Sequence, residues 1–285
     1  MNSLKKIFYL KLPLTLVERI QLFIQFALLK IKVRFFNQPN KIISLNIAGF
    51  KLNAYDYETA QYLLEEVWLN EDYYFKTNKK EPVIFDCGAN IGVSVLYFKA
   101  LYPESTIIAF EPNPNLFALL KKNVQVNQLK DVYIHQVALN AKDEEISFFI
   151  NENLGSFLSS KFQHRGGNNE IKVKAEQLSG FMNNFANIDL LKMDIEGAEY
   201  EVIQELNEKK LLGTVHKYIV EYHYFKDRDQ GKIVTFINTF AQNGFAYTTD
   251  KPIDKSLSFQ DVVFTFTKSE KHILSLEQQT HSFPF

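Results

Sequence analysis

The side chains best suited to acid–base chemistry lie in two apolar segments of the second half of the chain. Lys192, Asp194 and Glu196 occur at every second position of the first segment, and His223 lies in the second. Because the unperturbed pKa of histidine is near neutrality, His223 is a candidate general base. Asp194 or Glu196 could take that role instead, or could orient a hydroxyl group. A histidine that is hydrogen-bonded within an aromatic core is the structural alternative.

Carboxylates and an imidazole at one place could also bind a divalent cation. Oxygen ligands would favour Mg²⁺ over Zn²⁺. The sequence contains no closely spaced ligand motif that supports such a site. We therefore predict no metal residue and keep Mg²⁺ as the less favoured alternative.

Periodicity indicates which elements position these groups. Leu190–Met193 is typical of a buried strand, and alternation places Lys192 and Asp194 on the same side at its carboxyl end. Lys217–Tyr224 predicts a second strand, in which Glu221 and His223 share one face. A helix is expected from about Ala198. We expect Glu199 only to favour the start of that helix, since negative charge stabilises a helix N-terminus.

A second motif, in the first half of the chain, is typical of a nucleotide-binding turn. The apolar run Val83–Phe85 predicts a buried strand and is followed by Asp86-Cys-Gly-Ala-Asn-Ile-Gly92. Apolar residues at helical spacing begin at Val93. A strand, a turn of small residues and a helix together expose backbone N–H groups to a ligand. Asn90 is acceptable in the turn because asparagine visits left-handed conformations more readily than most residues.

Glu111 lies about twenty residues after this turn, at the end of the predicted strand Thr106–Phe110. Rossmann-type sites place there the carboxylate that accepts both ribose hydroxyls. The cofactor-binding residues expected from the two motifs are Asp86, Gly88, Asn90, Gly92 and Glu111. A nicotinamide site would need Gly-x-Gly-x-x-Gly, which the turn does not contain.

The two motifs resemble the FkbM family of S-adenosylmethionine-dependent methyltransferases. The likeness rests on Asp86–Gly92, on Glu111-Pro112 and above all on Leu191-Lys-Met-Asp-Ile-Glu-Gly-Ala-Glu199, and it extends from about residue 80 to about residue 250. It implies a class I methyltransferase (Rossmann-like) α/β fold, with a seven-stranded, mostly parallel sheet and helices on both faces. In that strand order, Lys217–Tyr224 is expected beside Leu190–Met193, so that Glu221 and His223 approach Asp194 and Lys192.

The resemblance implies methyl transfer from S-adenosylmethionine but does not name the acceptor. We expect O-methylation of a hydroxyl on a small molecule or glycan, with Asp194, Glu196, His223 and Lys192 as the catalytic set. The alternative is a non-catalytic relative that binds the cofactor or a partner protein. An NAD-dependent oxidoreductase ranks third.

Length and composition agree with an enzyme of this size. The chain has 285 residues, 46% of them hydrophobic, with 32 basic and 33 acidic side chains. No Arg-rich tract indicates nucleic acid as a partner. The single cysteine, Cys87, cannot form an internal disulfide, which favours a reducing, cytoplasmic location.

We divide the chain into an N-terminal extension (1–80), a methyltransferase domain (81–268) and a C-terminal tail (269–285). The extension contains a long apolar run, Leu14–Phe36, which charged residues interrupt too often for a bilayer span. A helix packed on the domain, or on a second subunit of a homo-oligomer, is the favoured explanation. Peripheral contact with a membrane surface is the alternative. Lys41–Asn53 predicts a β-hairpin, broken at Ala48-Gly49, and a further helix follows it.

Residues 146–174 depart from the alternation of strands and helices. Two short strands, Ile146–Ile150 and Ile171–Val173, are predicted with polar loops beside them. Ser156, His164 and Arg165 in these loops are candidates for contacting an acceptor, although each is more simply explained as an ordinary loop residue.

Overall fold

The structure is a computed structural model, which describes residues 3–150, 169–229, 231–254 and 256–268. The chain forms two compact units, Met1–Ala138 with Glu145–Lys174, and Leu139–Glu144 with Ala175–Phe285. The loop residues Ser156, His164 and Arg165, and the tail from residue 269, lie outside the described residues.

The main sheet has seven strands in the order β11-β12-β10-β9-β3-β4-β5. The strands are β3 (Val83–Cys87), β4 (Thr106–Phe110), β5 (Val132–His135), β9 (Ile188–Met193), β10 (Val215–Phe225), β11 (Phe245–Thr249) and β12 (Phe259–Lys268). The pairs β3–β4, β4–β5 and β9–β10 are parallel, and β12 runs antiparallel to both β10 and β11. The expected class I methyltransferase fold is confirmed, including the position of the strand with His223 beside the strand that precedes Asp194.

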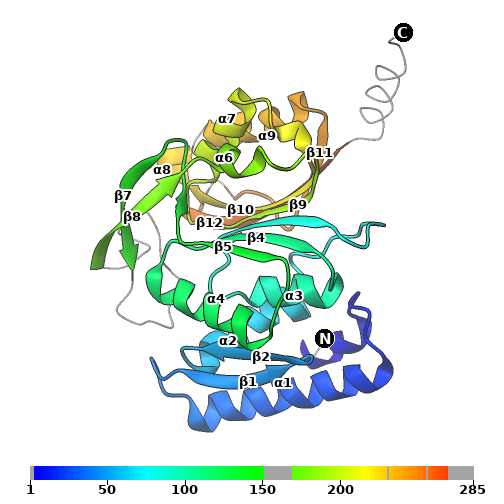
Figure 1. Cartoon of the computed structure of the whole chain (residues 1–285). Coiled ribbons are helices and arrows are strands. Elements are labelled where there is room, and N and C mark those ends of the chain that lie inside the picture. The colour runs from blue at the N-terminus through cyan, green and yellow to red at the C-terminus, as the bar shows by residue number, and fades with distance from the viewer. Residues whose placement is uncertain (1–2, 151–168, 230, 255, 269–285) are drawn as a thin grey trace. The chain divides into compact units, whose positions relative to one another are not determined.

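In the first unit, helices separate the sheet strands from an N-terminal layer. The helices α3 and α4 lie against β3–β5, while the hairpin β1–β2 and the long helix α1 lie on the other side of them (Figure 1). These and the remaining elements of the unit are the 3₁₀ helix η1 (Ser3–Tyr9), α1 (Leu16–Phe36), β1 (Ile43–Ile47), β2 (Phe50–Ala54), α2 (Tyr57–Leu64), the π-helical turn η2 (Glu65–Leu69), α3 (Val93–Leu101) and α4 (Pro114–Val126).

The predicted hairpin and N-terminal helix are therefore present. Ala48 and Gly49 both have positive φ, 47° and 85°, in the two-residue turn between β1 and β2. This is the left-handed pair that a tight hairpin turn requires. Helix α1 begins with a capping box, in which the Thr15 side chain accepts from the Glu18 N–H and the Glu18 carboxylate accepts from the Thr15 N–H.

In the second unit, α6 (Leu178–Met182), α7 (Glu199–Glu208) and α9 (Lys232–Gln242) lie on one face of β9–β12 (Figure 1). Aromatic side chains fill the space between α9 and these strands, with Phe240 stacked on Phe266 at 3.7 Å between ring centroids. Tyr222 of β10 packs on Phe236 of α9. Because strand side chains alternate, this packing turns His223 to the opposite face of β10.

A small second sheet follows β5. Its strand order is β6-β8-β7, from β6 (Ala138–Leu139), β7 (Glu144–Ile150) and β8 (Asn169–Glu176). The two strands predicted in residues 146–174 are thus present in longer form. The remaining short helices, η3 (Leu212–Thr214) and α8 (Lys226–Asp229), flank β10.

A buried amide joins the hairpin to the turn that follows β3. Asn123 of α4 is 1% exposed, and its Oδ1 accepts from the Asn53 N–H at 2.7 Å. Its Nδ2 donates to the carbonyl oxygens of Asn53 and Ile91, at 3.0 Å and 2.9 Å. The N-terminal hairpin therefore helps to fix the backbone of the turn.

We predict that Asn123→Ala lowers the free energy of unfolding by about 2 to 3 kcal/mol, because it leaves buried backbone groups of Asn53 and Ile91 without partners. Urea titration measures this change. Lys122→Ala, an exposed substitution on the same helix, serves as the control and should stay within about 0.5 kcal/mol of the parent protein. Equal stability of both variants would contradict the structural role of the amide.

Candidate active site

The turn between β3 and α3 adopts the conformation expected of a nucleotide-binding turn. Gly88, Asn90 and Gly92 all have positive φ, 84°, 52° and 89°. The Asn90 side chain accepts from the Ile91 N–H at 2.7 Å, which stabilises the left-handed backbone locally. A Cβ at Gly92 would lie 2.7 Å from Leu120 Cδ1, so a side chain there would also require the buried Leu120 side chain to shift. The predicted tolerance of Asn90 for this turn is confirmed.

Glu111 reaches this turn from the end of β4. Its Oε2 accepts from the Asn90 N–H at 3.0 Å, and its Oε1 accepts from the Asn113 N–H at 2.8 Å. The side chain is 5% exposed. A carboxylate at this position of a Rossmann-type site accepts the hydroxyls of a ribose. The structure thus brings Glu111 to the predicted turn.

Asp86 stabilises the same turn from the end of β3. Its Oδ2 accepts from the Ser94 hydroxyl at 2.5 Å, and the side chain is fully buried. Ser94 lies in the first turn of α3 and was not among the residues expected from the sequence. The hydroxyl ties the start of the helix to the carboxyl end of the strand, so the first N–H groups of α3 keep a fixed direction.

The second group of candidate residues lies around the carboxyl end of β9. Lys192 Nζ is 3.6 Å from Asp194 Oδ2, with Lys192 buried and Asp194 partly exposed. This agrees with the alternation expected for the strand. Glu196, two residues farther on, has a positive φ of 58°, a conformation that costs free energy for a residue other than glycine. Strain of this kind is common at functional sites.

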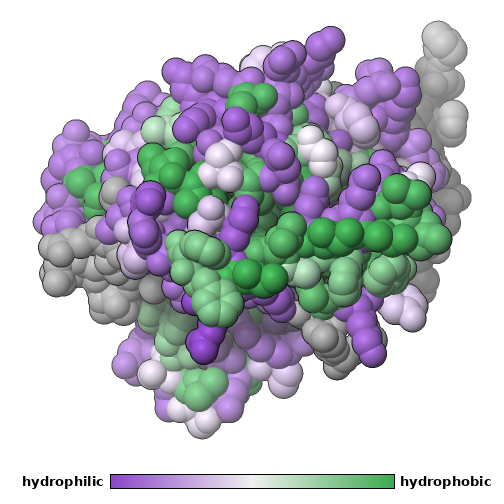
Figure 2. Space-filling model, turned by 90° about the horizontal axis from the view of Figure 1, so that it is seen from below, coloured by the Kyte–Doolittle hydropathy of each residue, from purple (hydrophilic) through white to green (hydrophobic). Residues whose placement is uncertain are grey.

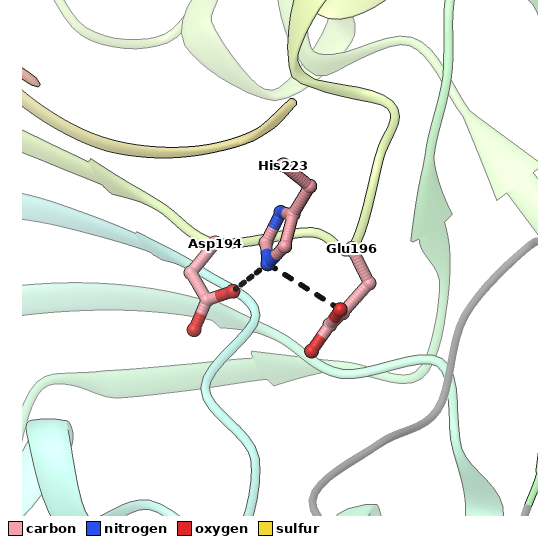
Figure 3. Close-up of side chains that lie close together, drawn as sticks. All are labelled: Asp194, Glu196 and His223. Carbon is pink, nitrogen blue, oxygen red and sulfur yellow. Dashed lines mark ion pairs between the residues drawn. The ribbon is translucent and has the colours of Figure 1, made fainter. Parts of the chain in front are cut away.

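His223 is the centre of this group. Its Nδ1 is 2.8 Å from Glu199 Oε1, while its Nε2 is directed at other carboxylates. Nε2 lies 3.7 Å from Asp194 Oδ1 and 3.4 Å from Glu196 Oε2, as Figure 3 shows. It lies 3.6 Å from Asp261 Oδ1 and makes no hydrogen bond. The predicted approach of His223 to Asp194 is therefore observed, and Glu196, whose approach was not predicted, lies near the same nitrogen.

Burial and charge act in opposite directions on the two central groups. Burial lowers the pKa of His223, but the nearby carboxylates of Glu196, Glu199 and Asp194 outweigh it and raise that pKa to about 10. Burial likewise raises the pKa of Glu199, and the His223 charge and hydrogen bonds outweigh it, lowering the pKa to about 2. Both shifts favour an imidazolium paired with a carboxylate at neutral pH.

The expectation that Glu199 only favours the start of a helix is wrong. Glu199 is the first residue of α7, and its Oε1 accepts from the Gly197 N–H at 2.8 Å and the Ile195 N–H at 3.3 Å. The same oxygen contacts His223 Nδ1. Its carboxylate therefore orients the imidazole as well as stabilising the loop before the helix.

Three further residues were missed by the sequence analysis. Asp261 of β12 is the register partner of His223 on the neighbouring strand. Arg228 donates from Nη2 to the His223 carbonyl oxygen at 2.6 Å and from Nη1 to the Gly197 carbonyl oxygen at 3.2 Å. Asp229 pairs with Arg228 at 2.6 Å. Arg228 thus links the backbone of β10 to the loop that carries the carboxylates.

Among the described residues, two groups of side chains offer ligand atoms within 4.8 Å of one another, as a metal site requires. One is Asp194, Glu196 and His223, and the other is Glu221, His223 and Asp261. Both share the imidazole, so they are two arrangements of one cluster. Such a donor set could hold a divalent cation, although acidic clusters also occur without one.

Comparison with known proteins places this geometry in a family. A model described as the methyltransferase FkbM domain matches residues 86–247, more than half of the chain, from the first turn residue to β11. The chain belongs to the FkbM methyltransferase family. The resemblance inferred from the motifs is thereby confirmed, and the family implies S-adenosylmethionine as the methyl donor.

Three curated relatives of this FkbM-family chain are named methyltransferases. It is 26% identical to Methyltransferase 1 of Beauveria bassiana over 212 residues, which cover 67% of this chain and 83% of that protein. It is 29% identical over 204 residues to Methyltransferase sdnD of Sordaria araneosa, covering 61% and 78% of the two chains. It is 27% identical over 141 residues to 2-O-methyltransferase NoeI of Sinorhizobium fredii, covering 44% and 57%.

The turn of this FkbM-family protein fits S-adenosylmethionine chemically. Left-handed residues at Gly88, Asn90 and Gly92 turn the chain sharply at the end of β3, and the buried Glu111 carboxylate lies beside them. The N–H groups of residues 88–92 are hydrogen-bonded within the protein, whereas the first N–H groups of a helix such as α3 have no intrahelical partner and suit the carboxylate of a methionine group. The Glu111 carboxylate suits ribose hydroxyls.

We predict that Glu111→Ala weakens binding of S-adenosylmethionine by about 10- to 100-fold, because it removes a charged hydrogen-bond acceptor beside the turn. Calorimetric titration with S-adenosylmethionine and S-adenosylhomocysteine measures the loss, and NAD tests the specificity. Glu104→Ala, at an exposed residue paired with Lys80, is the control and should bind as the parent does. Unchanged affinity of Glu111→Ala would remove Glu111 from the cofactor site.

Proposed function

We propose that this FkbM-family methyltransferase transfers the methyl group of S-adenosylmethionine to a hydroxyl oxygen of a small molecule or glycan. The observation that carries the proposal is the His223–Glu199 pair, with Nδ1 held at 2.8 Å and Nε2 free of hydrogen bonds beside Asp194 and Glu196. Once Nε2 has lost its own proton, such a pair can remove the proton of a hydroxyl. One relative, NoeI, is named a 2-O-methyltransferase, which supports oxygen as the acceptor atom.

The cofactor would be held by the turn residues and by Glu111. Asp86 would maintain the turn through Ser94, and Gly88, Asn90 and Gly92 would allow the backbone to approach the ligand. When bound, S-adenosylmethionine supplies a methyl group on a positively charged sulfur, activated for attack by a nucleophile. These assignments rest on the turn geometry described above.

His223 Nε2 would accept the proton of the acceptor hydroxyl as the new oxygen–carbon bond forms and the sulfur–carbon bond breaks. The products are a methyl ether and S-adenosylhomocysteine, with the proton on Nε2. Glu199 would stabilise the resulting imidazolium and keep the ring in the correct orientation. Asp194 and Glu196 would orient the hydroxyl by accepting from it, and Lys192 would hold Asp194 in place.

The charge of the cluster favours a neutral acceptor. Four carboxylates surround His223 within 4 Å, namely those of Asp194, Glu196, Glu199 and Asp261. The nearby positive groups are the imidazole, Lys192 and Arg228, and Arg228 is itself paired with the carboxylate of Asp229. A phosphate or carboxylate on the acceptor would be repelled by this excess of negative charge, whereas a hydroxyl would find several acceptors.

We predict a kcat/KM that rises about tenfold per pH unit from pH 6 and levels off near pH 10, because His223 must lose its proton before it can act as a base.

His223→Ala should lower kcat/KM by about 100- to 10,000-fold while S-adenosylmethionine affinity stays within about twofold. Glu199→Gln should move the pH profile to lower pH, since the Glu199 charge raises the pKa of His223.

An acceptor must be identified before these rates can be measured. The protein is incubated with methyl-labelled S-adenosylmethionine and with methyl glycosides or hydroxylated small molecules, and the products are identified by mass spectrometry. Amine analogues of the active acceptors test the preference for oxygen. His216→Ala, at an exposed histidine of the same strand, is the control and should retain full activity. A pH profile that is flat through neutrality would assign the base to Asp194 or Glu196 instead.

Two further outcomes separate the remaining alternatives. Loss of activity in EDTA, restored by Mg²⁺, would show that the carboxylate–histidine cluster works through a metal ion. Tight binding of S-adenosylmethionine without turnover on any acceptor would support a non-catalytic relative.

A further inference from the structure

Helix α1 has two apolar faces, and only one of them is used inside the protein. Leu22, Phe26 and Leu29 are buried on the inner face. The outer face carries an equally apolar row, which we call the outer stripe. It consists of Val17, Ile20, Ile24, Leu28, Ile31 and Phe35, whose exposed fractions run from 45% for Ile20 to 72% for Phe35.

The outer stripe is continuous along the helix. Its members are three or four residues apart, so at about 100° per residue they fall on one side of α1, nearly opposite the buried row. The helix has 21 residues and is therefore about 31 Å long. In Figure 2, which views the molecule from the side where α1 lies in Figure 1, hydrophobic atoms form a band across this face. An apolar surface of this extent on a soluble protein indicates a contact surface.

Basic side chains flank the outer stripe. On the same helical projection, Lys32 and Arg34 lie about 80° to either side of its centre. Arg34 is exposed, as is Lys5 in η1. Long basic side chains at the edges of an apolar helix face can reach lipid phosphates while the apolar side chains enter the acyl boundary.

Charge is distributed unevenly along the chain, although the overall balance is nearly neutral. Residues 1–41 contain eight of the 32 basic and one of the 33 acidic side chains, for a net charge of +7, against −8 for residues 42–285. The basic residues of this segment are Lys5, Lys6, Lys11, Arg19, Lys30, Lys32, Arg34 and Lys41. Two copies that met symmetrically through the outer stripe would bring these positive segments together. An anionic bilayer has the opposite charge and an apolar interior.

We propose that the outer stripe of α1 docks this protein on the surface of a membrane that contains anionic lipid. The helix lies in the plane of the interface. None of the described helices combines the length and the apolar character that a membrane crossing would require. Docking of this kind needs both the apolar contact and the basic charges, since each alone gives only weak binding.

The test is flotation of the full-length protein with phosphatidylcholine vesicles, alone and with about a third of the lipid replaced by phosphatidylglycerol. We expect at least tenfold stronger binding to the anionic vesicles, and weaker binding when NaCl is raised from about 0.1 M to about 1 M. Ile24→Gln with Ile31→Gln should reduce binding about tenfold, and so should Lys5→Gln with Arg34→Gln.

Matched controls change comparable exposed residues elsewhere. Val234→Gln with Leu257→Gln is the apolar control, and Lys121→Gln with Lys122→Gln is the charge control. Circular dichroism verifies that every variant folds. Equal binding of the stripe variants and the controls, or no binding to anionic vesicles, would overturn the proposal. So would a lipid-free dimer, seen by light scattering, that Ile24→Gln with Ile31→Gln dissociates.

Discussion

The arrangement of the catalytic groups depends on one buried ion pair, between Glu199 and His223. Both side chains are almost completely excluded from solvent, and burying a charge costs several kcal/mol unless a partner and hydrogen bonds compensate it. The Glu199 carboxylate receives that compensation from the imidazole and from the N–H groups of Gly197 and Ile195. The pair therefore fixes both the ring and the loop between β9 and α7.

The surrounding elements supply the geometry that this pair requires. The parallel pairing of β9 and β10 places Lys192 opposite Ile219, and β10 continues past the end of β9 to His223. Aromatic packing between α9 and β10 directs His223 to the opposite face of β10, and Arg228 ties the His223 backbone to Gly197. With Nδ1 occupied by Glu199, the reactive nitrogen that remains is Nε2, which is the nitrogen directed at Asp194 and Glu196.

Local patterns predicted much of this structure, because they depend on neighbouring residues. The predicted strand Thr106–Phe110 has the same first and last residues in the structure. The left-handed backbone at Asn90 follows from the residue types of the turn. The contacts of Glu199 and Asp261 could not be predicted in this way. Glu199 contacts His223, which is 24 residues away in the sequence. Asp261 lies beside His223 because of the register between two antiparallel strands. Neither contact produces a periodic pattern in the sequence. The exposure of one apolar face of α1 also needed the fold, because its sequence is apolar on both sides.

The most direct test of the central ion pair is ¹⁵N NMR of histidine-labelled protein as a function of pH. His223 is assigned among the six histidines by comparison with His223→Gln. The structure predicts that both ring nitrogens carry protons at neutral pH and that Nε2 loses its proton only near pH 10, with Nδ1 remaining protonated toward Glu199. A titration near the ordinary value of about 6.5, or a neutral ring protonated at Nε2, would contradict the account.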